Sequence, residues 1–336
     1  MGQTVSGTDL TAHFFTLIRA GLHESDLSGF PELSSGEWKA ILVMARRQTV
    51  TGLLYRGLAH LPAGHPVPEG LMYTLIAEIG TIEKQSRKIR DVAGRLTARF
   101  REAGLHPVVM KGPAVAEFYA EPLLRECGDL DLYFPEGEFS RVHEVASGIV
   151  GPGTVTPAPD GSIHFSYDGV NIDIHDRYFD IHASRLPEVP SGEATLLMLS
   201  SHILKHCMGP GIGLRQICDM AMAYKAIPFD PEALRECYGK ARLTRWNKLL
   251  SSFIQEYLGV ESLYDELPSP APLLNIITDG GNFGHYNSSR GKALGRSAFR
   301  RKTDTAARYL RRLPFSIKYA PREIFPSLWE LLKGNL

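Results

Sequence analysis

The sequence has no excess of charge of either sign, because its 37 Lys and Arg residues are balanced by 37 Asp and Glu residues. A protein that binds nucleic acid through overall positive charge is therefore not indicated. No apolar run approaches the roughly 20 residues that a helix needs to span a bilayer, and the first residues lack the basic and apolar regions of a secretory signal. The four cysteines form no Cys-x-x-Cys pair. We therefore expect free thiols, a cytoplasmic location and no contact with a membrane.

Apolar residues recur at helical spacing toward both ends of the chain, whereas the strand signals are concentrated in the middle. Hydrophobic residues make up 43% and charged residues 22% of the 336 positions, an ordinary globular composition with enough apolar residues for a sizeable core. We therefore expect an α+β protein with an N-terminal helical region at 1–106, a strand-bearing core at 107–185 and a C-terminal helical region at 186–336.

Individual helices are predicted from this spacing and from residues that favour helix ends. In the N-terminal region the expected helices cover 10–22, 36–47, 51–61 and 68–102. In the C-terminal region they cover 193–207, 214–226, 231–240 and 244–258. The long N-terminal helix carries a charged face between Glu83 and Arg90, which is typical of a solvated surface.

The central region contains two acidic residues in the pattern Gly128-Asp129-Leu130-Asp131-Leu132. Alternation of acidic and apolar residues predicts a half-buried strand, with Asp129 and Asp131 on one face and the leucines in the core. Two carboxylates about 7 Å apart or closer repel each other unless a cation lies between them. Mg²⁺ prefers oxygen ligands and commonly uses one or two carboxylates together with substrate phosphates. Solvated strand ends also carry such pairs, so the surrounding sequence has to show whether this pair binds a metal ion.

Upstream of the acidic pair, a short apolar strand over 108–110 ends at Lys111-Gly112-Pro113, and a helix is expected over 114–119. At such a junction, backbone N–H groups and the N-terminus of the helix can face an anion. The side chain of Lys111 could contact a phosphate there, or it could extend into solvent.

A second pair of strands is expected over 162–167 and 170–175, because Asp168-Gly169 between them is a strong signal for a two-residue hairpin turn. On the second of these strands, Asp173 shares a polar face with an asparagine and a histidine. Asp173 is thus a candidate third carboxylate beside the acidic pair, and a solvated strand residue is the alternative.

Seven residues between 108 and 134 carry a resemblance to a known family. They are Lys111, Gly112, Tyr119, Pro122, Arg125, Asp129 and Asp131. In this order they are similar to the pattern of the bacterial "uncharacterised nucleotidyltransferase" family, which belongs to the DNA polymerase β-like nucleotidyltransferase superfamily. The resemblance implies a nucleotidyltransferase-type mixed β-sheet core between the two helical regions.

The resemblance also implies a reaction, the transfer of an NMP group from an NTP such as ATP to an acceptor, with release of pyrophosphate. It implies that Asp129, Asp131 and Asp173 bind Mg²⁺ or Mn²⁺, and that Asp173 helps to activate the acceptor. The triphosphate would be contacted by Lys111, Gly112 and Arg125.

The identity of the acceptor stays open at this point. A small molecule, a sugar, a peptide, a protein and an RNA end are all compatible with this reaction. A nucleotide-binding pseudoenzyme or a partner-binding protein on the same fold is one alternative to the enzyme, and a related phosphotransferase is another. Eleven Lys or Arg residues and one acid stand between Arg290 and Arg322. This basic stretch could meet a phosphate-rich partner such as a nucleic acid, but a solvated helical face is the favoured interpretation.

Two pairs of polar residues lie at helical spacing in the C-terminal region. His202 and His206 share a face, but Ile203 stands where a zinc protease requires Glu, so we expect a face toward the cleft or plain packing instead of a zinc site. Arg215 and Asp219 lie one turn apart and are expected to form an exposed ion pair of low energy, with a substrate role for Asp219 left open.

Overall fold

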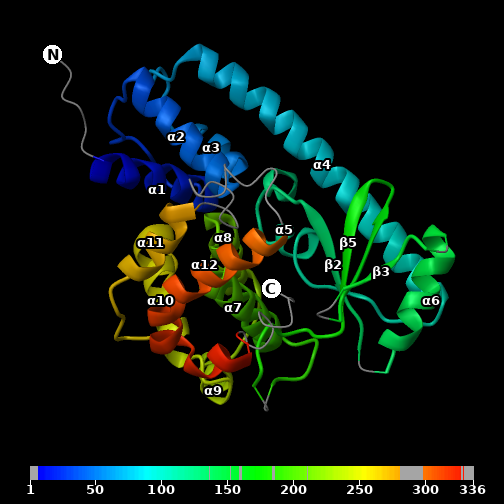
Figure 1. Ribbon diagram of the computed structural model, residues 1–336. Coiled ribbons are helices and arrows are strands. Elements are labelled where there is room, and N and C mark those ends of the chain that lie inside the picture. The colour runs from blue at the N-terminus through cyan, green and yellow to red at the C-terminus, as the bar shows by residue number, and fades with distance from the viewer. Residues whose placement is uncertain are drawn as a thin grey trace.

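The computed structural model describes residues 7–135, 137–151, 153–158, 161–183, 186–209, 211–280, 298–326 and 328. Within these residues the chain forms a mixed sheet flanked by helices, which confirms the expected α+β fold class (Figure 1). None of the described helices is both long enough and apolar enough to cross a membrane.

The N-terminal region contains the four expected helices. They are α1 (Gly7–His23), α2 (Ser35–Gln48), α3 (Thr51–Leu58) and α4 (Glu69–Glu102). Helix α2 begins where the sequence supplies a capping box, because the Ser34 hydroxyl accepts from the Glu37 backbone N–H and the Glu37 carboxylate accepts from the Ser34 N–H. Helices α1 and α3 can approach closely because Gly57 has no side chain, and a Cβ there would lie 2.1 Å from the Leu17 carbonyl oxygen.

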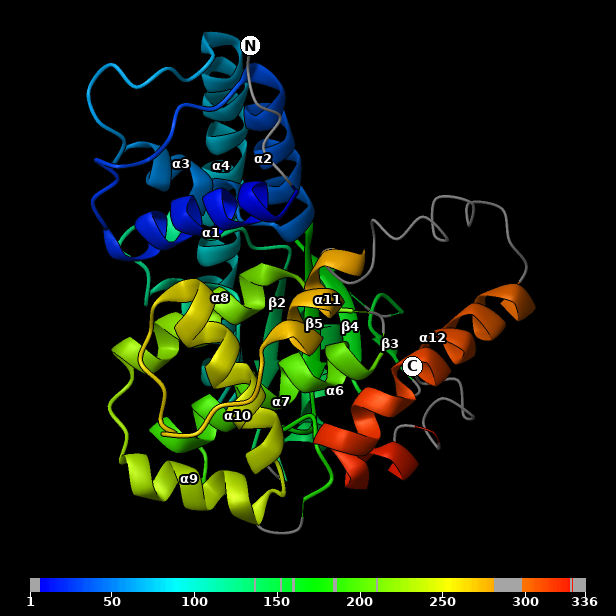
Figure 2. The same cartoon turned by 90° about the vertical axis from the view of Figure 1, so that its left-hand side faces the viewer.

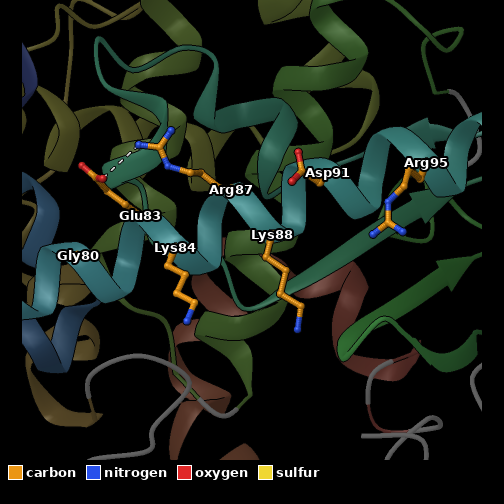
Figure 3. A pocket seen from close by; sticks show the side chains of 7 residues that line it. All are labelled: Gly80, Glu83, Lys84, Arg87, Lys88, Asp91 and Arg95. Carbon is orange, nitrogen blue, oxygen red and sulfur yellow. Dashed lines mark hydrogen bonds and ion pairs between the residues drawn. The ribbon is translucent and has the colours of Figure 1, made fainter.

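Helix α4 runs from the N-terminal helices to the far end of the sheet (Figure 1). The apolar stripe of its C-terminal half, which includes Leu96 and Phe100, is buried against the sheet. Its other face is charged, as the sequence predicts, and Figure 3 shows Glu83, Arg87 and Lys88 lining a depression along it. Glu83 and Arg87 form an ion pair of 3.2 Å with exposed side chains.

The sheet has five strands in the order β1-β2-β5-β4-β3. Their bounds are β1 (Val108–Val109), β2 (Asp129–Tyr133), β3 (Thr156–Pro157), β4 (Ile163–Tyr167) and β5 (Val170–His175). Strands β2 and β5 are parallel, and the other neighbours are antiparallel. The predicted hairpin joins β4 to β5, and Asp168 (φ 51°) and Gly169 (φ 69°) take the positive φ values that such a turn requires.

The chain between β1 and β2 contains α5 (Pro113–Ala116) and η1 (Pro122–Leu124), and α6 (Phe139–Val150) follows β2. Helix α5 is a single turn, so the prediction of a helix over 114–119 is wrong in its length. The i→i−3 bond from the Phe118 N–H to the Val115 carbonyl shows the chain tightening out of helical geometry. One turn aligns few peptide dipoles, so α5 adds little positive potential at the end of β1.

The two faces of the sheet differ in character. Leu130, Leu132, Ile172 and Ile174 alternate along β2 and β5 and are fully buried in the core formed with α4 and α6. The residues between them on each strand are polar and point to the opposite face. The predicted division of β2 into a core face and an acidic face is therefore confirmed.

Two helices of the C-terminal region lie over this polar face, α7 (Gly192–Met208) and α8 (Leu214–Ala226) (Figure 2). The C-terminal region also contains α9 (Pro231–Lys240), α10 (Thr244–Phe253), α11 (Ala271–Gly280) and α12 (Ala298–Tyr319), with a π-helical turn η2 (Ile254–Leu258) after α10 and a 3₁₀ turn η4 (Pro321–Glu323) after α12. They share one hydrophobic core with the N-terminal helices, in which Phe15 and Phe253 pack edge to face with ring centroids 5.8 Å apart. All four cysteines are free thiols, as expected.

Candidate active site

A cleft of about 270 Å³ lies between the polar face of the sheet and helices α7 and α8. The six residues that the sequence predicts for the site all line it. They are Lys111, Gly112, Arg125, Asp129, Asp131 and Asp173. The loops on either side of α5, together with β2 and β5, bring them together from three separate parts of the chain.

The three acidic residues meet because β2 and β5 are parallel neighbours. The register places Asp131 directly opposite Asp173 and Asp129 opposite Asn171. Burial raises the pKa of Asp129, and the negative charges of Asp131 and Asp173 raise it further. Such repulsion between carboxylates favours the binding of a cation at the end of β2.

Asp131 is the most buried of the three acids, with 8% of its surface exposed. Its Oδ1 atom lies 3.1 Å from Lys111 Nζ and 2.9 Å from His175 Nε2. Burial alone would raise the pKa of Asp131, but the Lys111 ammonium and the hydrogen bond from His175 hold it well below its ordinary value. Asp131 is therefore ionised, and one of its oxygens is already engaged by protein groups.

A hydrogen-bond chain leads from Asp173 to the next strand of the sheet. Asp173 Oδ1 lies 2.6 Å from His164 Nδ1, and His164 Nε2 lies 2.8 Å from the Ser162 hydroxyl. The hairpin register places His164 directly opposite Asp173. The imidazole is thus held between two partners, and it orients the Asp173 carboxylate in the cleft.

Helix α7 supplies two further histidines to the cleft, His202 and His206. His202 Nδ1 lies 3.0 Å from Asp180 Oδ2 and 3.3 Å from Lys111 Nζ, and Asp180 also pairs with Lys205 at 2.8 Å. The rings of His202 and His206 pack edge to face with centroids 4.5 Å apart. Both histidines line the cleft, so of the two expected arrangements this face of the helix is the one toward the cleft.

Lys111 does not extend into solvent, because its side chain is only 14% exposed and is directed at Asp131. The next residue, Gly112, has φ 58° and ψ −112°, a conformation that L side chains rarely adopt. A Cβ at this position would also lie 3.3 Å from the Asp129 carbonyl oxygen. Glycine is therefore required for the chain to turn back over the end of β2.

Arg125 was expected to contact the triphosphate, but the structure pairs it with Asp219 on α8. Its Nε and Nη2 atoms lie 3.1 and 2.5 Å from the two carboxylate oxygens, and Nη1 donates to the Glu126 carbonyl oxygen and to the Cys127 sulfur. The Tyr119 hydroxyl donates to the same carboxylate at 2.8 Å. All three guanidinium nitrogens therefore have protein partners.

The expected exposed pair between Arg215 and Asp219 is wrong. Asp219 is only 3% exposed, and its two oxygens are used by Arg125 and Tyr119. Arg215 instead donates from Nη1 to the Glu126 carbonyl oxygen at 2.7 Å. Spacing along one helix could not predict this, because the partners of Asp219 come from the loop before β2.

The cleft carboxylates supply only some of the ligands that a divalent ion needs. Across the described ranges, no three His, Cys, Asp or Glu side chains form a ready-made metal site. The Asp129 carboxylate makes no hydrogen bond or ion pair with any described residue, and Asp131 uses only Oδ1. Two oxygen donors with further positions left to phosphate and water are the set that Mg²⁺ commonly takes.

The cleft brings acids on one face of the sheet together with cationic side chains, among them Lys111 and Arg215. Residues 34–188 match the model of the family described as "uncharacterised nucleotidyltransferase", and this match supports a transferase of nucleotide groups. The match confirms the resemblance inferred from the sequence. Comparisons with curated proteins and with solved structures gave no match.

Several cleft residues were not found from the sequence. His164 could have been, because counting back from the Asp168-Gly169 turn places it opposite Asp173. Asp180 and Arg215 carry no local signal. Asp180, in the chain between β5 and α7, is held by His202 and Lys205 of α7, and Arg215 reaches the cleft through the packing of α8 on the sheet.

Proposed function

We propose that this protein is a metal-dependent nucleotidyltransferase that moves an NMP group from an NTP to an acceptor and releases pyrophosphate. The observation that carries the proposal is the placement of Asp129 and Asp131 on one face of β2, with Asp173 in register with Asp131 on β5 and all three lining one cleft. The catalytic core would be 107–185, between helical regions at 1–106 and 186–336. The free cysteines suit a cytoplasmic enzyme.

Asp129 and Asp131 would hold Mg²⁺ or Mn²⁺, and Asp173 would complete the site. A bound ion supplies Lewis-acid stabilisation to the phosphoryl oxygens. Lys111 keeps Asp131 ionised and places a positive charge beside the phosphates. The ring of His175 fixes the same carboxylate from the neighbouring strand.

In the transfer step, an oxygen of the acceptor attacks the α-phosphorus while the bond to the bridging oxygen breaks and pyrophosphate leaves. Asp173 would accept the proton of the acceptor, with His164 holding its carboxylate in place. An unpaired acid in this position would be free to rotate away from the acceptor, and the His164 contact reduces that freedom.

The proposal is tested by incubating the protein with each α-³²P-labelled NTP in Mg²⁺ or Mn²⁺ and following pyrophosphate release, self-labelling and labelling of added acceptors. The Asp129→Asn variant serves as the inactive control. Transfer of label from γ-³²P-NTP alone would indicate a phosphotransferase. Binding of NTP without transfer to any acceptor would indicate a nucleotide-binding protein on the same fold.

A further inference from the structure

Arg215, near the N-terminus of α8, forms no ion pair with any residue that the structure describes. Among the described residues, its one hydrogen bond is the 2.7 Å contact from Nη1 to the Glu126 carbonyl oxygen, and no carboxylate lies within 4.0 Å of its guanidinium. The Nε atom is buried and has no partner in that part of the chain. A buried N–H donor without a partner is costly, so such a group generally serves a ligand, a water or an ion.

The nearby acids are committed to other groups. Asp219 lies one turn along α8, but both of its oxygens bond to Arg125 and Tyr119. The Glu126 carboxylate accepts from the Thr51 backbone N–H at 2.9 Å. Burial lowers the pKa of Arg215, and the charge of Arg125 lowers it further. Arg125 thus holds the Asp219 carboxylate, whereas Arg215 only lies near it.

The cleft is therefore polarised. Asp129, Asp131 and Asp173 line it on the sheet side, and Arg215 lines it on the helical side. A metal ion is favoured at the acidic wall, and a polyanion that bridges from this ion to the opposite wall would meet Arg215.

We propose that Arg215 binds the phosphate chain of the donor nucleotide, with its unpartnered Nε–H as one of the contacting groups. This inference rests on the proposed function, since it assigns the anion that faces the metal-binding acids. A guanidinium suits this role because it forms directed, charge-assisted bonds to phosphate oxygens and stays charged when buried. Arg215 then takes the part that Arg125, whose nitrogens are all engaged, was expected to play.

The test uses calorimetric titration of the full chain with inorganic tripolyphosphate in Mg²⁺, so that neither the base nor an acceptor affects the result. Arg215→Gln keeps a polar side chain at this position of α8 but removes the charge. We expect it to weaken tripolyphosphate binding by about tenfold or more, the usual effect of losing a charge-assisted bond. The control is Lys225→Gln in the last turn of the same helix, where the amine contacts His23, and it should bind as the wild type does.

The alternative role of Arg215 is purely structural, through the Glu126 carbonyl. A folded Arg215→Gln protein that binds tripolyphosphate as tightly as the wild type would overturn the inference and leave the proposed function intact. A wild-type protein that binds neither tripolyphosphate nor any NTP would overturn both.

A second measurement is independent of how the variant folds. In the wild-type protein labelled with ¹⁵N-arginine, the Nε–H resonance of Arg215, identified by its loss in Arg215→Lys, should move on addition of tripolyphosphate. An unchanged Arg215 resonance at saturation, with binding seen by calorimetry, would place the phosphates elsewhere in the cleft.

Discussion

The Arg125–Asp219 pair gives the sharpest test of how this cleft is built. Its side chains are 6% and 5% exposed, and the guanidinium contacts both carboxylate oxygens. Asp219→Asn keeps the shape of the side chain and an acceptor for Tyr119, but it leaves Arg125 as a buried cation without an anion. Removing one partner of a buried pair typically costs about 3–5 kcal/mol. The charge of Arg215 nearby favours the upper part of this range.

The loss is measured as the change in free energy of unfolding from urea titration followed by circular dichroism. The control is Glu83→Gln, which removes the same charge from the exposed pair on α4 in Figure 3. An exposed pair between positions i and i+4 contributes only about 0.3–0.5 kcal/mol, so this variant should unfold almost as the wild type does. The difference between the losses of unfolding free energy in Asp219→Asn and Glu83→Gln reports the effect of burial.

A double variant separates the cost of an orphaned charge from the value of the pair itself. Replacing both partners with apolar residues, as in Arg125→Met with Asp219→Leu, leaves no uncompensated charge and is often neutral or stabilising. We therefore expect it to be more stable than Asp219→Asn alone. If Asp219→Asn unfolds like the wild type while Arg125→Met loses NTP affinity tenfold, Arg125 is a phosphate ligand and the structural interpretation is refuted.

Three further predictions concern the acids and Lys111. Asp129→Asn and Asp131→Asn should each abolish metal-dependent NTP turnover in a pyrophosphate-release assay, but their stabilities should differ. Asp129→Asn should be neutral or stabilising because it relieves repulsion between carboxylates. Asp131→Asn should be destabilising because it leaves the buried Lys111 charge without an anion. Equal melting temperatures for the two variants would contradict this expectation. Asp173→Asn should leave NTP affinity nearly intact by calorimetry while transfer is lost, and a collapse of affinity would make it a primary ligand. Lys111→Ala should weaken Mg-NTP binding by about tenfold or more but NMP binding much less, since a charge-assisted contact contributes about 1.5–3 kcal/mol. Equal small losses of affinity for NTP and for NMP would show that Lys111 takes no part in phosphate recognition.

Local patterns in the sequence were sufficient for most of the elements and for the acidic strand. Alternation from Gly128 to Leu132 places the leucines in the core, because successive side chains of a strand point to opposite faces. Asp168-Gly169 predicts the hairpin because both residues tolerate positive φ. These features depend on backbone geometry over a few residues, and this is why they can be read from one sequence.

The tertiary structure alone decided which charges are paired. Arg125 meets Asp219 across 94 positions of the chain, and Asp131 meets Asp173 through the parallel register of β2 and β5. The two arginines therefore differ. Arg125 is neutralised by Asp219, whereas Arg215 lines the cleft on the side opposite the acids. The energy of a charge inside a protein depends on its neighbours in space and on its distance from water, and neither is encoded in the spacing of residues along the chain.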